Sequence, residues 1–280
     1  MIQPVKMEEI VHHNNLSAKI LPQTLSGDNF RVPPHWHKDI ELNLILSGTS
    51  LSIVDGRPSI LTSGDMCVIN SRKIHSGDTP DESVPIRLIT IQWDYDFFTR
   101  YCPDFPKYQF SLTGRADILP EIRSRVLQIA DLYAAKKPYY EMKISALLLE
   151  TGYLLLEHCL EENPYYYDYE STRKAIQIQN AITYMEENYS QQISLTQIAD
   201  QANMSPAYFS RKFKQLTGIN FSECLALYRV QKARDELMNT ENTMTEIAFN
   251  NGFANVKSFI QYFRKQYHTT PKQYQKAHKT

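Results

Sequence analysis

The chain has 280 residues, of which 42% are hydrophobic and 22% charged, a balance typical of a folded globular protein with room for two domains. No uninterrupted apolar stretch is long enough to cross a membrane, and residues 1–15 lack the apolar core of a secretory signal, so we expect a cytoplasmic protein without a membrane partner. The four cysteines form no CxxC pair, which favours reduced thiols over disulfides or a zinc site: Cys67, Cys102, Cys159 and Cys224.

Charge is divided unevenly along the chain. The formal net charge is −1, but residues 171–280 hold 14 Lys and Arg against 8 Asp and Glu, a net of +6, and residues 1–170 hold 16 against 23, a net of −7. A basic half joined to an acidic half indicates a polyanion as the partner of the C-terminal half alone. Chance segregation of solvated charges explains the same counts, so charge by itself leaves both interpretations open.

Short β-strands are predicted between residues 18 and 93. Apolar runs rich in Ile, Leu and Val are separated there by turn signals such as Ser-Gly and Asp-Gly. Many short strands at regular spacing predict a sandwich or a barrel. The predicted strands cover residues 40–46, 51–54, 66–69 and 86–93.

Two amphipathic helices are predicted next, over residues 118–133 and 139–160, and together they form a helical hairpin. The second helix is apolar over more than one face, which suits either a helix sandwiched inside its own domain or the seam of a homodimer. We expect residues 1–165 to form a homodimer through this hairpin. The leucines concerned are Leu147, Leu148, Leu149, Leu154, Leu155 and Leu156.

Residues 161–170 have neither a helical nor a strand period, and Pro164 cannot continue the helix before it. We therefore expect a linker without regular structure at residues 163–174. It separates a front domain at residues 1–162 from a helical domain at residues 175–280.

The C-terminal half contains an internal repeat. Residues 198–213 match residues 247–263 once one residue is inserted in the turn of the second copy, because an Ile-Ala pair, one bulky apolar residue and two phenylalanines recur in order. Each copy is typical of a helix, a turn and a second helix. Helix N-caps are predicted at Ser194, Ser205, Asn220, Thr243 and Asn255, with capping boxes at the first and fourth of these.

One helix over residues 220–238 is predicted to join the two copies, and at 1.5 Å per residue it is about 28 Å long. A connecting helix of this length can hold the second helices of the two copies about one DNA turn apart, so that they enter successive major grooves. Their free faces carry Arg and Gln, which bind guanine and adenine edges, and Lys, which binds phosphate. These faces present Ala207, Ser210, Arg211 and Lys214, then Val256, Lys257, Gln261 and Arg264; helices packed only on protein are the alternative.

Residues 193–274 resemble the DNA-binding domain of the AraC family of bacterial regulators, whose pattern ends in a phenylalanine-rich helix followed by Thr-Pro-x-x-Tyr, here residues 270–274. The resemblance implies double-stranded DNA, a small-molecule effector and RNA polymerase as partners of an activator. The chain departs from the family at Gln261, where arginine is usual, and at Ile260, where a small polar residue is common, so the second unit would read different bases or bind more weakly. The base contacts implied are Ala207, Ser210, Arg211, Val256, Lys257, Ile260 and Gln261.

The front domain resembles the cupin barrel in two histidine motifs. In cupin enzymes, three imidazoles and one carboxylate hold iron, manganese, nickel or zinc, and the matching residues here are His35, His37, Glu41 and His75. Asn70 and Arg72 stand where the cupin pattern prefers proline and glycine, so we expect no metal and no cofactor. The predicted fold class is α+β: a cupin-like β-barrel with a helical hairpin, then an all-α domain of two helix-turn-helix units.

A small barrel whose interior mixes aromatic faces with polar groups suits a sugar or a similar polar metabolite. The sequence therefore predicts a DNA-binding transcription regulator controlled by that ligand, and not an enzyme. A metal-dependent cupin enzyme fused to a DNA-binding tail is the main alternative, and a nucleoid-type structural DNA binder is a third, which the acidic front domain disfavours. The candidate ligand-binding residues are His35, Trp36, His37, Glu41, His75, Arg87 and Trp93.

Overall fold

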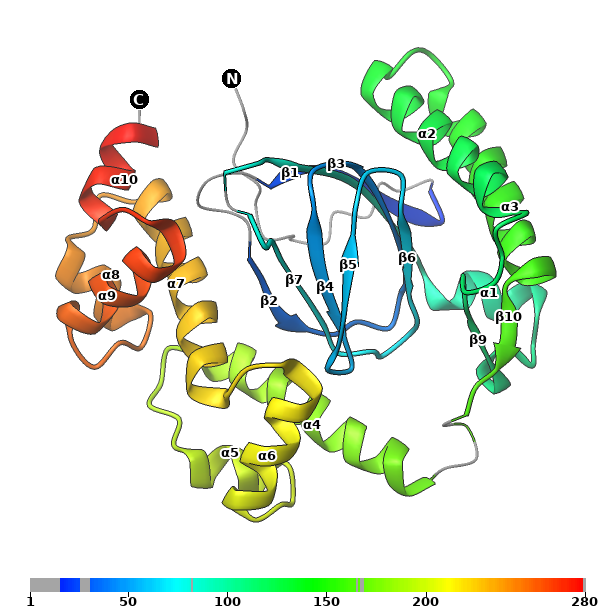
Figure 1. The fold of residues 1–280 in the computed structure, drawn as a ribbon. Helices are drawn as coiled ribbons and strands as arrows, with labels where there is room; N and C mark the ends of the chain where they lie inside the picture. The colour runs from blue at the N-terminus through cyan, green and yellow to red at the C-terminus, as the bar shows by residue number, and fades with distance from the viewer. Residues whose placement is uncertain (1–15, 26–30, 82, 165, 167–168, 279–280) are drawn as a thin grey trace.

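The computed structural model describes residues 16–25, 31–81, 83–164, 166 and 169–278 and places a β-barrel between two groups of helices (Figure 1). Residues 1–15, where the sequence predicts no secretory signal, lie outside this part of the chain. Among the described helices, none is both long enough and apolar enough to cross a membrane. The predicted α+β class, with strands first and helices last, is confirmed.

Two four-stranded antiparallel sheets form the barrel, with strand orders β1-β8-β3-β6 and β2-β7-β4-β5. Each predicted strand is confirmed within a residue, but β1, β2, β5 and β7 were not predicted individually. The residues of β2, β5 and β7 are mainly Pro, Gly, Ser, His and charged types, and β1 is interrupted by Lys, Pro and Gln. The strands are β1 (Ala18–Leu25), β2 (Val32–His35), β3 (Ile40–Ser47), β4 (Ser50–Val54), β5 (Arg57–Leu61), β6 (Met66–Ile69), β7 (His75–Asp78) and β8 (Ile86–Trp93).

The helical hairpin lies against the outer face of the first sheet (Figure 1). It consists of α2 (Leu119–Ala135) and α3 (Tyr140–His158), close to the predicted ranges. Between β8 and the hairpin come α1 (Tyr95–Tyr101), the short 3-10 helix η2 (Phe105–Lys107) and β9 (Tyr108–Phe110).

The side chains of β3 alternate between two environments. Ile40, Leu42 and Leu44 lie in the large apolar core between the sheet and the hairpin. Glu41 and Asn43 lie on the opposite face of the strand, inside the barrel, where polar partners from neighbouring strands meet them. The period-2 pattern of one strand thus supplies both a core and a polar interior.

The leucine-rich pattern of α3 is explained largely by packing within its own domain. Four of the six leucines are buried against α2 and the sheet, and Leu156 is partly buried. Leu149 is the exception at 44% exposed, and it shares one helix face with Met142, Ala146 and Tyr153, which are also exposed. The surface available for a partner is therefore this narrower stripe and not the leucine run.

The expected linker contains more regular structure than the sequence indicates. Helix α4 (Tyr169–Asn188) begins inside the predicted range of 163–174, and strand β10 (Leu160–Glu162), which pairs with β9, ends directly before it. The sequence did not indicate these two elements, because β10 has only three residues and the start of α4 is polar and aromatic. Only a short stretch between them lacks helix or strand among the described residues.

Seven helices complete the described chain, and their caps follow the predicted pattern. Both capping boxes are present, at Ser194 and Thr243, and the side chains of Ser205, Asn220 and Asn255 accept from the expected backbone N–H groups. The helices are α4 (Tyr169–Asn188), α5 (Leu195–Gln201), α6 (Pro206–Thr217), α7 (Phe221–Asn239), α8 (Met244–Asn250), α9 (Val256–Tyr267) and α10 (Pro271–His278).

The barrel packs against the first helix-turn-helix unit. The indole Nε1 of Trp36 donates to the carbonyl of Gln179 in α4 at 3.2 Å, and the Gln179 amide donates to the carbonyl of Arg72. Ile74, only 1% exposed, lies within the apolar core of that unit together with residues of α4, α5, α6 and α7. Two barrel loops, one before β3 and one before β7, are therefore part of the contact with the C-terminal helices.

A second contact joins the β4–β5 turn to the end of α6. Gly56 in this turn has φ +76°, and a Cβ there would lie 1.7 Å from the carbonyl oxygen of Gln215. Ile53 in β4 lies against Gly218, the left-handed residue that ends α6. Only glycine at position 56 permits so close an approach of the two backbones.

Candidate nucleic-acid interface and effector site

The first candidate DNA-contacting helix is α6, whose inner face buries Phe209 and Phe213. On its outer face, the predicted residues Ala207, Arg211 and Lys214 are exposed and Ser210 is half-buried. The guanidinium of Arg211 lies 5.4 Å from the centre of the Tyr208 ring, which directs this long side chain without removing its donors from solvent. The structure thus brings the four residues together on one accessible face.

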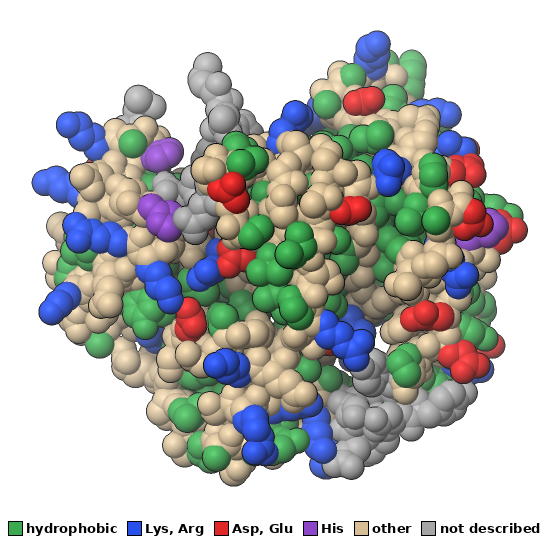
Figure 2. All heavy atoms as spheres, viewed as in Figure 1, with side chains coloured by type: hydrophobic (Ala, Val, Ile, Leu, Met, Phe, Trp, Pro, Cys, Tyr) green, Lys and Arg blue, Asp and Glu red, His purple; other side chains and the backbone are tan. Residues whose placement is uncertain are grey.

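The second candidate DNA-contacting helix is α9. Lys257, Gln261 and Arg264 are exposed on it, whereas Val256 and Ile260 are half-buried and pack against the core of the second unit. This face therefore offers three polar side chains and two partly covered apolar ones. On the side of the molecule shown in Figure 2, Lys and Arg side chains lie over α6 and around α8 to α10, and Asp and Glu gather near α3 and β10.

The two units are joined by more than α7. Arg229 in α7 donates to the carbonyls of Tyr189 and Gln191, in the segment between α4 and α5, at 2.7 and 2.6 Å. Gln192 in the same segment donates to the carbonyl of Gly252, in the turn of the second unit, at 3.0 Å. The segment 189–192 consequently bridges both units.

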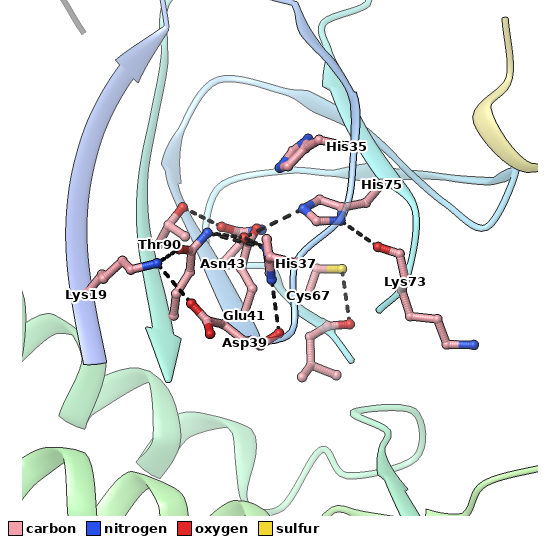
Figure 3. Close-up of polar contacts among 12 residues, drawn as sticks. Lys19, His35, His37, Asp39, Glu41, Asn43, Cys67, Lys73, His75 and Thr90 are labelled. Atoms are coloured by element: carbon pink, nitrogen blue, oxygen red, sulfur yellow. Dashed lines mark hydrogen bonds and ion pairs between the residues drawn. The ribbon is translucent and has the colours of Figure 1, made fainter. Parts of the chain in front are cut away.

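Inside the barrel, polar side chains from both sheets meet around Glu41 (Figure 3). His37 Nε2 lies 3.0 Å and His75 Nε2 3.7 Å from the Glu41 carboxylate, and the ring centres of His35 and His75 are 4.0 Å apart. Burial raises the pKa of Glu41, but hydrogen bonding and charge interactions with His37 and His75 lower it more, so the pKa lies well below the usual range. Burial and the neighbouring His75 lower the pKa of His35 to about 3, so its ring is neutral.

Several residues of this cluster were missed by sequence analysis. Asn43 and Gln92 donate to the Glu41 carboxylate at 2.6 and 2.8 Å, and the Thr90 hydroxyl donates to the Asn43 side chain. Lys19 approaches Gln92 from β1. These residues occupy alternate positions in β1, β3 and β8, so a strand alignment of the sequence was the signal that could have found them.

Three predicted pocket residues do not join the cluster. Trp93 pairs with Ile40 across β8 and β3, which puts it on the outer face, buried in the core under the hairpin. Arg87 lies on the same outer face of β8 and is exposed. Trp36 packs on the first helix-turn-helix unit instead. The positions of Trp93 and Arg87 follow from strand register, which the residue types alone do not reveal.

The two residues that depart from the cupin pattern keep its geometry by other means. Arg72 has φ +62°, the left-handed conformation that the family's glycine would favour, and its N–H donates to the carbonyl of His37. The Asn70 side chain bonds both the N–H and the carbonyl of Phe110, which fixes the loop to β9. The loop consequently still delivers His75 to the cluster.

A cavity of about 240 Å³ adjoins this loop outside the His cluster. Its lining comes from widely separated segments, which is why the sequence did not indicate it. Basic, aromatic and amide side chains contribute: Lys38, Asn70, Arg72, Lys73, Tyr95, Phe105, Tyr108, Gln109 and Asn163.

Two adjacent units that each present a capped, exposed polar helix, joined to a barrel with a polar interior, define a class of protein that couples DNA binding to ligand binding. Residues 17–151 match the family profile described as an AraC-like ligand binding domain, and residues 198–277 match a profile described as a helix-turn-helix domain. The chain belongs to the AraC family of ligand-responsive transcription regulators.

Individual relatives cover the chain to different extents. The HTH-type transcriptional activator RhaS of Escherichia coli O81 (strain ED1a) is 23% identical over 264 residues, 92% of this chain and 91% of that protein. The C-terminal domain of AraT, a response regulator from Geobacillus stearothermophilus, is 33% identical over 36% of this chain and 84% of that one, with a TM-score of 0.35. ToxT from Vibrio cholerae O395 is 12% identical over 94% of this chain and 98% of that one, with a TM-score of 0.48.

Proposed function

We propose that the chain activates transcription by reading two neighbouring DNA segments with α6 and α9, under the control of a polar small molecule bound in the barrel. The observation that carries the proposal is the pair of capped helices whose inner faces bury phenylalanines while their outer faces carry exposed polar side chains. Polar side chains of this kind can form hydrogen bonds with base edges in the major groove. The proposed contacts are Ala207, Ser210, Arg211 and Lys214 in α6, and Val256, Lys257, Ile260, Gln261 and Arg264 in α9.

Selection of bound fragments from a random-sequence DNA library tests this reading. We expect the full chain to enrich two short elements about 10–10.5 base pairs apart, because α7, with its 19 residues, separates the two units by about one DNA turn. An enriched pool without any shared element would overturn sequence-specific binding. Enrichment of a single element would restrict base reading to one unit.

We place the effector site at the Glu41 cluster, where buried histidines, amides and a hydroxyl offer donors and acceptors to a polyhydroxylated ligand such as a sugar. The cavity beside Arg72 is the competing position. Calorimetric titration of candidate sugars into the wild-type chain, Asn43→Ala and Tyr108→Ala separates the two. Loss of binding in Asn43→Ala alone supports the cluster, and loss in Tyr108→Ala alone moves the site to the cavity.

The exposed stripe on α3 supports a homodimer. Met142, Ala146, Leu149 and Tyr153 are spaced by four, three and four residues and lie on one side of the helix. An apolar helix face of this kind is buried when two copies pack around a twofold axis. RNA polymerase is the protein partner that an activator requires, and a transcription assay on the selected DNA tests that contact.

A further inference from the structure

The cavity beside Arg72 lies outside the barrel cluster, and the charges in its lining are all positive. Lys38, Arg72 and Lys73 contribute to the lining, and none of the described residues that line the cavity is Asp or Glu. Residues 1–170 as a whole hold 16 Lys and Arg against 23 Asp and Glu, so this gathering of cations is not a general feature of the front half. Cationic side chains around a hollow attract anions to it.

Two of the three cations have carboxylate partners outside the lining. Lys38 Nζ lies 2.9 Å from a carboxylate oxygen of Asp96, in a largely exposed pair, and Lys73 Nζ lies 3.0 Å from one of Asp55. The Arg72 guanidinium makes no ion pair and no hydrogen bond with the part of the chain that the structure describes. The cavity therefore has positive charge in excess of what the described carboxylates balance.

Arg72 and Lys38 act on the same wall of the cavity, at Tyr95. Lys38 Nζ lies 5.5 Å from the centre of the Tyr95 ring. Burial raises the pKa of the Tyr95 phenol, and the charges of Arg72 and Lys38 lower it. The Asp96 hydrogen bond raises the pKa of Lys38, whereas repulsion from Arg72 lowers it. An anion bound between these two cations would relieve their repulsion, and the phenol could donate to it.

The backbone does not explain why an arginine stands at position 72. Its φ is +62°, in the left-handed region where a side chain is strained and glycine is not. The Arg72 N–H donates to the carbonyl of His37 at 2.8 Å, and its carbonyl accepts from the Gln179 side chain, so neither contact uses the guanidinium. A strained residue whose side chain has no partner within the described chain indicates a functional constraint.

Contacts between distant segments fix the walls around Arg72. The Asn70 side chain accepts from the N–H of Phe110 at 2.8 Å and donates to its carbonyl at 2.9 Å. The N–H of Asn163 donates to the carbonyl of Lys107 at 2.9 Å. The loop before β7, strand β9 and the segment after β10 therefore keep fixed relative positions, and binding a ligand between them costs little ordering of the chain.

The size and the remaining walls restrict the ligand to a compact one. The cavity volume is about 240 Å³, below the roughly 300–1,000 Å³ of pockets that enclose drug-sized ligands. Tyr95, Phe105 and Tyr108 contribute aromatic rings that can cover a carbon skeleton. A guanidinium binds two phosphate oxygens at once, and an ammonium adds a point charge. The lining suits a phosphate group joined to a small polar body.

We propose that this cavity is a second ligand site and binds the phosphate monoester of a small sugar or polyol. Arg72 binds the phosphate through two N–H donors, Lys38 adds a second positive charge, and Tyr108 covers the organic part. The site is separate from the Glu41 cluster, where we place a polar effector without a requirement for charge. The proposal does not depend on DNA binding by the C-terminal half.

Calorimetric titration of glucose 6-phosphate into the full-length chain, in a buffer without phosphate or sulfate, tests the site. We expect one sugar phosphate per chain, and a loss of affinity of about tenfold in Arg72→Gly and a smaller loss in Lys38→Gln. Arg72→Gly removes the guanidinium and also relieves the left-handed backbone, so this variant should fold at least as well as the wild type.

The control is Arg100→Gln, because Arg100 is exposed on α1 and does not line the cavity. Its affinity for the sugar phosphate should equal that of the wild-type chain. Equal affinity in Arg72→Gly and the wild type overturns the site, and so does a wild-type chain that does not bind the sugar phosphate at millimolar concentration.

Two reference compounds separate the phosphate from the organic part. Any binding of glucose should be the same in the wild type and in Arg72→Gly, because glucose has no phosphate for the guanidinium, and a loss equal to that of the sugar phosphate overturns the role of the anion. Inorganic phosphate should bind more weakly than the sugar phosphate, because it leaves the aromatic wall uncovered. Equal affinities overturn the assignment to an organic ligand.

The variant Asn43→Ala separates this cavity from the barrel interior. A loss of sugar phosphate binding in Asn43→Ala, with none in Arg72→Gly, would place the ligand at the Glu41 cluster and overturn the proposal. Failure of the DNA selection above would overturn the proposed function and leave this site standing, whereas failure of these titrations would leave the proposed DNA reading untouched.

Discussion

Arg211 and Lys214 lie on the same exposed face of α6 but offer different chemistry. The guanidinium can bind both acceptors of a guanine, whereas the ammonium is a point charge suited to phosphate. We expect Arg211→Ala to cost about 1–3 kcal/mol on the selected DNA and little on random DNA, and Lys214→Ala to weaken both duplexes alike and lower the salt slope by about one unit.

Binding titrations on the two duplexes over a range of salt measure both effects. Lys212→Ala is the matched control, because Lys212 bonds Gln215 on its own helix and is half-buried. Equal losses on specific and random DNA for Arg211→Ala would remove its role as a base reader.

Glu186 in α4 is a residue that sequence analysis did not single out. Burial raises its pKa from 4.5 to about 7, while Lys232 lowers it. The folded chain then keeps a proton that the unfolded chain releases, so this group's contribution to stability is full below about pH 4.5 and is lost as the pH rises to about 7. We expect Glu186→Gln to flatten this decline and to raise the free energy of unfolding at pH 8 by about 1–2 kcal/mol.

Thermal or urea unfolding from pH 4 to 8 follows this change. The exposed Glu162 on β10 supplies the control Glu162→Gln, for which the pH profile should stay that of the wild-type chain, because Glu162 is not among the charges that shift the pKa of Glu186. A profile of Glu186→Gln that parallels the wild type would mean that Glu186 is charged throughout the range.

At the scale of single residues, the sequence predicted the caps and the exposed faces of the C-terminal half because both follow from local spacing. Ser194 and Thr243 satisfy backbone N–H groups within their own first turn. The barrel residues depend instead on register between distant strands. Trp93 and Gln92 are neighbours in sequence, yet one lies under the hairpin and the other beside Glu41. Alternation puts these two neighbours on opposite faces of β8, but no local pattern tells which face points into the barrel.

Among the elements, the β4–β5 turn offers a direct test of how the barrel meets α6. Gly56→Ala combines a strained backbone with a clash against the carbonyl of Gln215, whereas Gly114→Ala has a similar positive φ of +73° and nothing within 4 Å of the new Cβ. We expect a loss of about 1–2 kcal/mol for Gly114→Ala from backbone strain alone. Gly56→Ala should lose more, because the turn has to move away from α6.

Urea unfolding of both variants, with DNA binding measured in parallel, gives the comparison. Equal losses in stability and equal DNA affinities would mean that the turn does not fix the position of α6.

The long helices and the apolar strands were predicted from their periods, and the short polar strands were not. β2 and β7 carry Pro, Gly and His, yet β7 pairs with both β2 and β4 inside one four-stranded sheet, where neighbouring strands satisfy its backbone groups. Tertiary contacts outweigh local preference in such segments. The domain boundary at residues 163–174 stays a prediction, since α4 starts within it.

For the whole molecule, the apolar stripe of α3 predicts the oligomeric state. Leu149 and Tyr153 are 44% and 58% exposed. Replacing both by lysine should convert a dimer to a monomer, because like charges would face each other across a twofold axis. Ile60→Lys is the control, since Ile60 is 65% exposed on β5 of the barrel. Sedimentation equilibrium at tens of micromolar decides the matter: a wild-type chain that is already monomeric contradicts the prediction.

The bridge formed by residues 189–192 has a consequence for the evolution of binding sites on the genome. Arg229 and Gln192 tie this segment to both units, so the two reading helices keep one relative rotation. Inserting a single base pair between the two DNA elements turns one by about 35° relative to the other, at 10–10.5 pairs per turn. The protein cannot follow that rotation without breaking the bridge, and the duplex would have to twist instead. Promoters that recruit this regulator can therefore drift in the bases between the elements, but insertions and deletions there would be selected against.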